Sequence, residues 1–174
     1  MQECIFCKIV QKQIPAFIVY EDDLCLAFLD INPLAVGHTL VVPKKHTENI
    51  FDIEEKDLEH IAKVAKRIAG KMKESLGAEG VNLFQASGTV AGQSILHFHL
   101  HVVPRKADDG VNINEWWTSK ARRASKEELE EASKLIRIEA LQSVEVKETA
   151  QTVEEKVERN EKQVKYIKKL LEMA

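Results

Sequence analysis

Three histidines at alternating positions constrain the fold of this chain more than any other feature. His97, His99 and His101 make up half of the six histidines in the sequence, and each is followed by an apolar residue. Alternate residues of a β-strand point to the same face, so the pattern predicts a strand carrying three imidazoles in a row, spaced roughly 7 Å apart. The opposite face of that strand would enter a core through Phe98, Leu100 and Val102.

Such a row suits several kinds of chemistry, because imidazole is a nucleophile, a proton carrier or a metal ligand near neutral pH. Gly92, Gln93 and Ser94 precede it and offer a flexible backbone, an amide and a hydroxyl that can surround an anion. Together these features indicate phosphoryl chemistry. The competing interpretations are a purely metal-binding His-x-His-x-His site, since histidine is the commonest metal ligand, and three surface histidines without a function.

Composition excludes several other classes of protein. The 174 residues, 44% of them hydrophobic, suit one domain of ordinary size with an extension. A net charge of −3 gives no long-range attraction to nucleic acid, and the sequence lacks the Gly-x-x-x-x-Gly-Lys-Ser/Thr pattern of P-loop ATPases. It also lacks an apolar run of transmembrane length and an N-terminal signal pattern. We therefore expect a cytoplasmic protein with no membrane or nucleic-acid partner.

The three cysteines do not form the disulfide framework of a small secreted protein. Cys4 and Cys7 are a Cys-x-x-Cys pair in a short predicted helix or turn. A redox motif would follow the strand of a βαβ unit, which this sequence does not show, so the pair is interpreted either as two partly buried thiols or as half of a zinc site. Cys25 lies inside an apolar strand and is expected in the core.

The remaining pattern predicts four further strands and one long helix. The strands are expected at residues 17–20, 24–29, 38–43 and 81–85, separated by polar or proline-containing turns. The helix is expected to start at the N-cap Asp52, with Glu55 completing a capping box, and to stop at Gly77. Between them an apolar stripe recurs every three or four residues, which would lay the helix against a sheet.

The C-terminal third is predicted to be helical. Trp116 and Trp117 are interpreted as packing anchors, with ligand contacts as the alternative. Ser125 is interpreted as the cap of a helix whose apolar residues point inward: Leu129, Ala132, Leu135 and Ile136. From Val153 to Leu171 apolar residues alternate in steps of four and three, which is a short heptad seam with Asn160 at one core position. Fewer than four heptads are present, so the segment either pairs in a coiled coil or folds back on the body of its own chain. We therefore divide the chain into a domain at residues 1–120 and a helical extension at residues 121–174.

The motifs resemble those of the histidine-triad (HIT) superfamily. Its signature, His-φ-His-φ-His-φ-φ with φ apolar, matches residues 97–103 at every position. The segments 28–33 and 37–46 are also similar to the family pattern, and the cysteine pair resembles the zinc-containing branch of Hint-like and bacterial or archaeal members. The resemblance implies an α+β fold with an antiparallel sheet of about five strands and a long amphipathic helix, and it implies a homodimer.

By the same resemblance the protein is a hydrolase or transferase that acts at the α-phosphate of a nucleoside phosphoramidate or dinucleoside polyphosphate. His99 would form a nucleotidyl-histidine intermediate. Phosphate and the leaving atom would be held by His101, Ser94 and Gln93. An adenosine-based purine nucleotide would be bound by Asp30, Ile31, His38 and Gly92. A non-catalytic nucleotide-binding scaffold and a plain metal-binding protein are the alternatives, and turnover separates the enzyme from both.

The resemblance also implies a structural zinc ion held by Cys4, Cys7, His46 and His97. One segment departs from the family. Related sequences commonly have Asn-x-Gly shortly before the triad, whereas this chain has Ala86, Ser87 and Gly88. Either Ser87 replaces the asparagine contact to the substrate, or the pocket favours a different nucleotide or leaving group.

Overall fold

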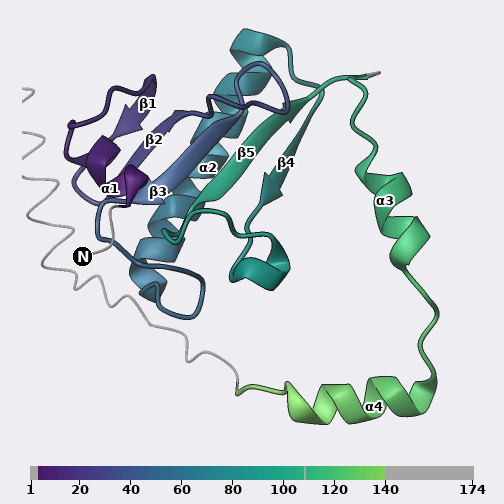
Figure 1. The fold of residues 1–174 in the computed structure, drawn as a ribbon. Helices are drawn as coiled ribbons and strands as arrows, with labels where there is room; N and C mark the ends of the chain where they lie inside the picture. The colour runs from purple at the N-terminus through teal and green to yellow at the C-terminus, as the bar shows by residue number, and fades with distance from the viewer. Residues whose placement is uncertain (1–3, 108, 140–174) are drawn as a thin grey trace, which may run out of the picture. The chain divides into compact units, whose positions relative to one another are not determined.

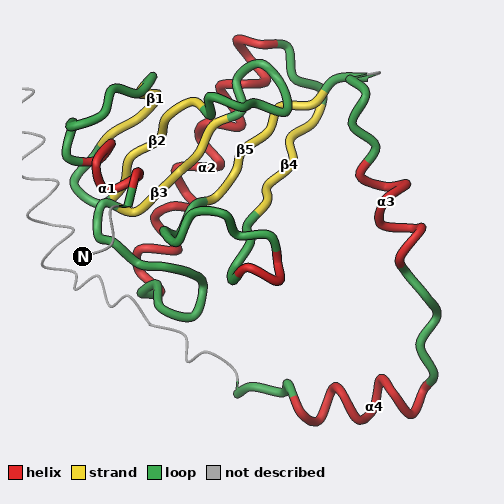
Figure 2. The backbone as a smooth tube through the Cα atoms, viewed as in Figure 1, coloured by secondary structure: helices red, strands yellow, loops and turns green. Residues whose placement is uncertain are grey.

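The computed structural model describes residues 4–107 and 109–139 of the chain. Figure 1 shows the order of its elements in space, and Figure 2 the loops that join them. In chain order these elements are α1 (Ile5–Val10), β1 (Ile18–Glu21), β2 (Cys25–Leu29), β3 (Thr39–Pro43), α2 (Glu55–Leu76), β4 (Gly80–Phe84), the 3-10 helix η1 (Thr89–Ala91), β5 (Leu100–Arg105), α3 (Ile113–Lys120) and α4 (Lys126–Leu135).

The five strands form one antiparallel sheet in the order β1-β2-β3-β5-β4. This confirms the predicted α+β fold, and the first four strands begin within one residue of their predicted starts. β3 is central, and all five of its residues are buried, because elements cover both faces of the sheet at this point. Its register places Leu40 opposite His101 of β5. The last of the three alternating histidines therefore lies near the middle of the sheet.

Side chains alternate along the strands and build two cores on opposite faces. α2 lies across one face (Figure 1) and buries Ile61, Val64 and Ile68 against β2, β3 and β5. Cys25 belongs to this core, as predicted, with no exposed surface. On the other face Phe6 and Ile9 of α1 pack on a smaller core made of Leu26, Phe28, Leu40 and Val42.

The two ends of α2 differ in how well the sequence predicted them. Gly77 ends the helix in the left-handed conformation at φ +63°, as expected. The start was predicted wrongly, because the N-cap is Glu54 rather than Asp52. Asn49 accounts for the difference: its carbonyl accepts from the backbone N–H groups of Asp52 and Ile53, at 3.3 and 3.2 Å. This turn occupies the residues that the capping-box pattern had assigned to the first helical turn.

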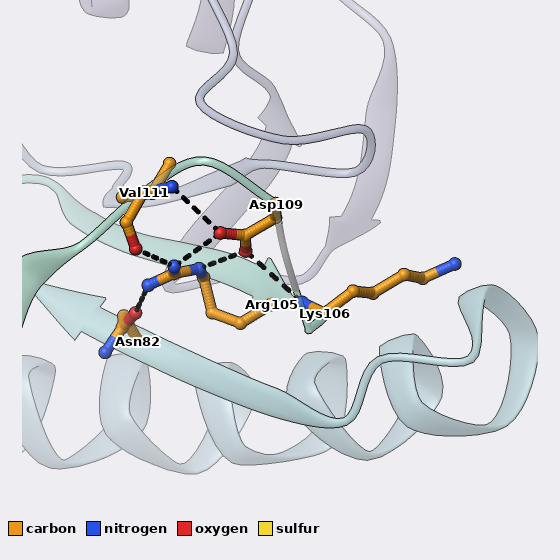
Figure 3. A network of polar contacts seen from close by, with 5 residues as sticks. All are labelled: Asn82, Arg105, Lys106, Asp109 and Val111. Carbon is orange, nitrogen blue, oxygen red and sulfur yellow. Dashed lines mark hydrogen bonds and ion pairs between the residues drawn. The ribbon is translucent and has the colours of Figure 1, made fainter.

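The chain leaves β5 through a cluster of hydrogen bonds around Arg105 (Figure 3). The guanidinium makes a two-point contact with Asp109, at 2.6 Å from Nε to Oδ2 and 2.7 Å from Nη2 to Oδ1. Nη1 donates to Oδ1 of Asn82 on β4 at 2.5 Å, and Nη2 also donates to the carbonyl of Val111. These contacts fasten the loop after β5 to the edge strand and fix the end of β5 that lies away from the histidines.

The chain separates into two compact units, Met1–Lys120 and Ala121–Ala174. In the first unit, Trp116 and Trp117 on α3 touch each other with ring centroids 6.3 Å apart, and both are more than half exposed. They are therefore not the packing anchors that the sequence suggested.

In the second unit α4 starts with the predicted capping box between Ser125 and Glu128, but its predicted inward residues Leu129, Leu135 and Ile136 are exposed.

The predicted heptad seam at residues 153–171 lies outside the described residues. Within the described part of the chain, no helix has the length and apolar character needed to cross a membrane.

Candidate active site

The three histidines share one side of the chain, but only His101 belongs to a strand. β5 begins at Leu100, so His97 and His99 precede it in a bend, contrary to the prediction of one strand through all three. The pairing of β5 with β3 ends at Leu100, and the backbone N–H of Phe98 donates instead to the carbonyl of Thr47 at 2.7 Å. The predicted alternation survives, because Phe98 enters the core beneath α2 while the histidines face the side of α1.

The contacts of His99 fix which of its nitrogens carries the proton. Nδ1 lies 2.6 Å from the backbone carbonyl of His97, and a carbonyl only accepts, so Nδ1 holds the hydrogen. Nε2 is then left with its lone pair, which is the form of imidazole that attacks an electrophile. The ring of Phe6 packs edge-on at 5.3 Å between ring centroids and leaves His99 only 5% exposed. The middle histidine is therefore held in one tautomer and one orientation.

A second chain of hydrogen bonds fixes His101. The backbone N–H of Leu34 donates to Nδ1 of His38 at 3.2 Å, so the hydrogen of His38 is on Nε2. That nitrogen lies 2.9 Å from Nδ1 of His101 and donates to it, which leaves the hydrogen of His101 on Nε2. Burial lowers the pKa of both rings, that of His101 to about 4, so both are neutral at pH 7. The ring centroids of His99 and His101 are 4.9 Å apart, so a ring with a lone pair on Nε2 lies next to a ring with an N–H donor on Nε2.

The predicted nucleotide-binding residues of the loop after β2 lie next to this pair. Asp30, His38 and His101 each bring a polar atom into one cluster, with Oδ2 of Asp30 3.8 Å from Nδ1 of His38. The other carboxylate oxygen of Asp30 accepts from the backbone N–H of Asn32 at 2.8 Å. Ile31 is 82% exposed and therefore available to a ligand. The structure thus brings Asp30 and His38 together with His101, and Ile31 follows Asp30 in the chain.

Three residues that precede the triad, Gly92, Gln93 and Ser94, differ in exposure and in hydrogen bonding. Gly92 adopts φ +92° and ends η1, a conformation that suits glycine, and Ser94 is exposed without a hydrogen-bond partner in the described residues. The amide of Gln93, however, is 4% exposed and bonds to the protein backbone through both its oxygen and its nitrogen. Ser87 accepts from the backbone N–H of Ile50 and donates to Oε1 of Gln85, so its hydroxyl hydrogen is already engaged within the protein.

The four predicted metal ligands meet at the other end of the histidine row. Cys4 caps α1 and Cys7 lies one turn later, while His46 follows β3. Nε2 of His97 lies 2.9 Å from the carbonyl of Pro43 and donates to it, so Nδ1 of His97 presents a lone pair to the two sulfur atoms. Burial lowers the pKa of His97 to about 4 and raises that of Cys7 to about 11.

The separations among these four side chains fit a tetrahedral zinc ion. Bonds of about 2.0–2.1 Å to nitrogen and about 2.3 Å to sulfur would separate ligand atoms by roughly 3.3–3.8 Å. His97 Nδ1 lies 3.4 Å from the Cys4 sulfur, 3.6 Å from the Cys7 sulfur and 3.2 Å from His46 Nδ1. The Cys7 sulfur and His46 Nδ1 are 3.2 Å apart. Lone pairs brought this close are the arrangement expected of ligands that share one cation.

Comparison with known proteins agrees with this geometry. The sequence profile of the HIT domain matches residues 11–108. An uncharacterised HIT-like protein of Borreliella burgdorferi is 50% identical over 115 residues, which are 65% of this chain and 83% of that protein. The adenosine 5'-monophosphoramidase of Saccharomyces cerevisiae is 38% identical over 113 residues, which are 65% of this chain and 69% of the yeast protein.

Among solved structures, the zinc-bound histidine triad family protein of Mycobacterium smegmatis is 42% identical, with a TM-score of 0.62 over 64% of this chain and 81% of that one. The profile match covers more than half of the 174 residues and includes the whole histidine row. This chain therefore belongs to the HIT family.

Proposed function

We propose that this protein is a nucleotide hydrolase or transferase that breaks the bond between the α-phosphate of a nucleotide and its leaving group. The observation that carries the proposal is the pair of fixed tautomers, with the lone pair of His99 next to the N–H donor of His101. A plain metal-binding protein would not need an uncoordinated imidazole held ready for attack. The yeast relative named for adenosine 5'-monophosphoramidase activity supports the same reaction class.

The proposed reaction has two displacements at phosphorus. Nε2 of His99 attacks the α-phosphorus, a phosphorus–nitrogen bond forms, and the bond to the leaving amine or phosphate breaks while that group takes up a proton from solvent. His101 donates its Nε2–H to a phosphate oxygen throughout, and the hydroxyl of Ser94 donates to another. A water molecule then attacks the same phosphorus and gives its proton to solvent, the phosphorus–nitrogen bond breaks, and the nucleoside monophosphate and His99 are released. A second nucleophile in place of water would make the reaction a transfer.

For the substrate we propose an adenosine-based phosphoramidate or dinucleoside polyphosphate. Asp30 lies beside His38 and His101, where its carboxylate can accept hydrogen bonds from ribose hydroxyls. Ile31, exposed on the same loop, supplies an apolar contact for the base. We also propose that the protein forms the homodimer implied by the sequence resemblance.

Substitution of His99 tests the proposed function directly. A panel of adenosine phosphoramidate, diadenosine polyphosphates and a nucleotide sugar is assayed with native protein and with His99→Ala. We expect turnover by the native protein only, while the affinity for AMP stays within about tenfold, which is about 1.4 kcal/mol. His60→Ala is the control, because it removes an imidazole from α2 rather than from the histidine row. Activity of His99→Ala above a few per cent of native would exclude covalent catalysis by this residue.

Absence of turnover by native protein that still binds AMP would favour the non-catalytic nucleotide-binding scaffold instead. Absence of both turnover and AMP binding would favour a metal-binding protein.

We further propose that Cys4, Cys7, His46 and His97 hold a structural zinc ion. Four protein ligands complete a tetrahedron and leave no position for a reacting water molecule. The zinc would supply rigidity rather than chemistry, because it would tie α1 and the end of β3 to the first histidine of the row. His97 would then hold its carbonyl in place for Nδ1 of His99. The solved zinc-bound relative supports a metal in this family.

A further inference from the structure

Two loops that are distant in the sequence are joined at the end of the sheet where the histidines lie. One is the 44–54 loop between β3 and α2, and the other is the 85–99 loop between β4 and β5 (Figure 2). Ser87 accepts a hydrogen bond from the backbone N–H of Ile50 at 2.9 Å, and Gln93 donates from Nε2 to the carbonyl of Glu48 at 2.5 Å. Together with the bond from Phe98 N–H to Thr47, these contacts tie the two loops at three points.

The Gln93 side chain forms three hydrogen bonds, one that crosses to the 44–54 loop and two that stay within the 85–99 loop. Its Oε1 accepts from the backbone N–H of Gly88 at 2.7 Å, and its Nε2 donates to the carbonyls of Glu48 and Ile95, at 2.5 and 3.0 Å. A primary amide has two N–H donors, and both are used here. Gln93 is 4% exposed and the three bonds are part-buried, so their loss would weaken the hydrogen bonding of the two loops at this point. No donor of this amide remains for a phosphate oxygen.

A continuous chain of hydrogen bonds runs from Gln93 to the proposed nucleophile. The carbonyl of Ile95 that accepts from Gln93 also accepts from the backbone N–H of His97, at 2.8 Å. The carbonyl of His97 then accepts from Nδ1 of His99. Ser94, whose hydroxyl is free within the described residues, lies between the first two of these positions. Movement of the Gln93 amide would therefore shift the backbone that carries both Ser94 and His99.

We propose that Gln93 is a positioning residue that locks the 85–99 loop against the 44–54 loop and so aims Ser94 and His99, without touching the substrate. Its effect on turnover rests on the function proposed above, whereas the locking of the loops does not. Ser87 makes a second link between the same two loops. Both links hold the same pair of loops, so their effects should not be independent. The fold decrease in turnover of the double variant should be smaller than the product of the fold decreases of the two single variants.

The experiment compares Gln93→Met, Ser87→Ala, the double variant and, as control, Gln13→Met at an exposed glutamine in the segment before β1. Gln93→Glu is a second variant, because it keeps an acceptor for Gly88 N–H but faces the carbonyls of Glu48 and Ile95 with a charged oxygen in place of the two donors. Amide hydrogen exchange of ligand-free protein is followed in residues 44–54 and 85–99. We expect exchange to be at least about tenfold faster in the Gln93 variants and unchanged in the control.

Kinetics and melting temperature complete the test. We expect kcat of the Gln93 variants to fall by about tenfold to a hundredfold with KM within about threefold, since misplacement acts mainly on the reaction step. A raised KM with native exchange rates would show direct contact with phosphate and would overturn the proposal. A lower melting temperature with native kcat would show that Gln93 stabilises the fold without aiming Ser94 or His99, and would also overturn the proposal. If native protein turns over no substrate, the proposed function fails, and exchange alone decides whether Gln93 locks the loops.

Discussion

Single backbone groups determine the chemistry that each histidine can perform. The carbonyl of His97 fixes the tautomer of His99, and the N–H of Leu34 fixes that of His38 and, through it, that of His101. Three imidazoles that look equivalent in the sequence therefore differ: one is suited to bind metal, one to attack and one to donate a proton or hydrogen bond. Alternation alone cannot distinguish these roles, because it fixes only the side to which a residue points.

Burial of His101 predicts a specific dependence of stability on pH. The folded pKa is lowered to about 4, whereas an unfolded histidine titrates near about 6.5. At this residue the unfolded chain therefore binds more protons between these values, so the contribution of His101 to the free energy of unfolding should be constant above about pH 6.5 and should fall as the pH drops towards 4. His101→Asn should remove this contribution. Denaturant unfolding at pH 8, 6 and 5 measures it, and a difference between native and variant that does not change with pH would contradict the prediction.

At the scale of elements, Asp22 ties the turn between β1 and β2 to α2. One carboxylate oxygen accepts from the backbone N–H groups of Leu24 and Cys25, at 2.9 and 2.8 Å. The other accepts from the hydroxyl of Tyr20 at 2.7 Å and lies 2.6 Å from Nε2 of His60. Burial opposes the charge, but these hydrogen bonds outweigh it and hold the pKa of Asp22 well below its usual value.

Asp22→Asn should destabilise the protein by about 1–3 kcal/mol at pH 7, the usual range for lost hydrogen bonds to a charged group. Because the folded pKa of Asp22 is lowered, its contribution should be complete above the unfolded pKa of about 3.9 and should vanish as the pH falls further. Thermal or denaturant unfolding of native protein, Asp22→Asn and the exposed neighbour Asp23→Asn measures both effects. Equal stability of the two variants would show that the carboxylate of Asp22 contributes no more to the free energy of unfolding than that of the exposed Asp23.

The elements that the sequence predicted well are those that a single periodicity defines. The strands at 18–21, 25–29 and 39–43 and the apolar stripe of α2 follow from local patterns, and the meeting of Cys4, Cys7, His46 and His97 was expected from the family resemblance. The misses arise where a contact distant in sequence competes with a local pattern. His97 and His99 leave the strand because Phe98 bonds to Thr47, and the Gln93 amide is taken up by Glu48.

At the scale of the whole molecule, the proposed zinc ion would connect three separate parts of the chain. Elemental analysis of protein purified without a metal-binding tag should find about one zinc per chain, lost in Cys4→Ser and His46→Ala. Cys25→Ser is the matched control, because Cys25 lies in the core under α2 and not in the quartet. Thiolate and neutral imidazole are the binding forms, so a strong chelator or acid should remove the metal and lower the melting temperature. Full zinc content in both ligand variants would contradict the assignment.

The segment after Ser143 should affect assembly and not chemistry. Every proposed site residue precedes it, so a variant that ends at Ser143 should keep native kcat and KM. Val157, Val164 and Leu171 occupy one core position of the predicted heptads, and an apolar seam of this kind is buried only against another helix. Light scattering should therefore show more chains per assembly for the full chain than for the shortened variant. Val164→Glu should lower the number of chains per assembly to that of the shortened variant. Lys162→Glu, at an outward position of the same heptad, should leave this number as in the full chain. Equal mass, stability and solubility in all four proteins would mean that the heptad spacing reflects composition alone.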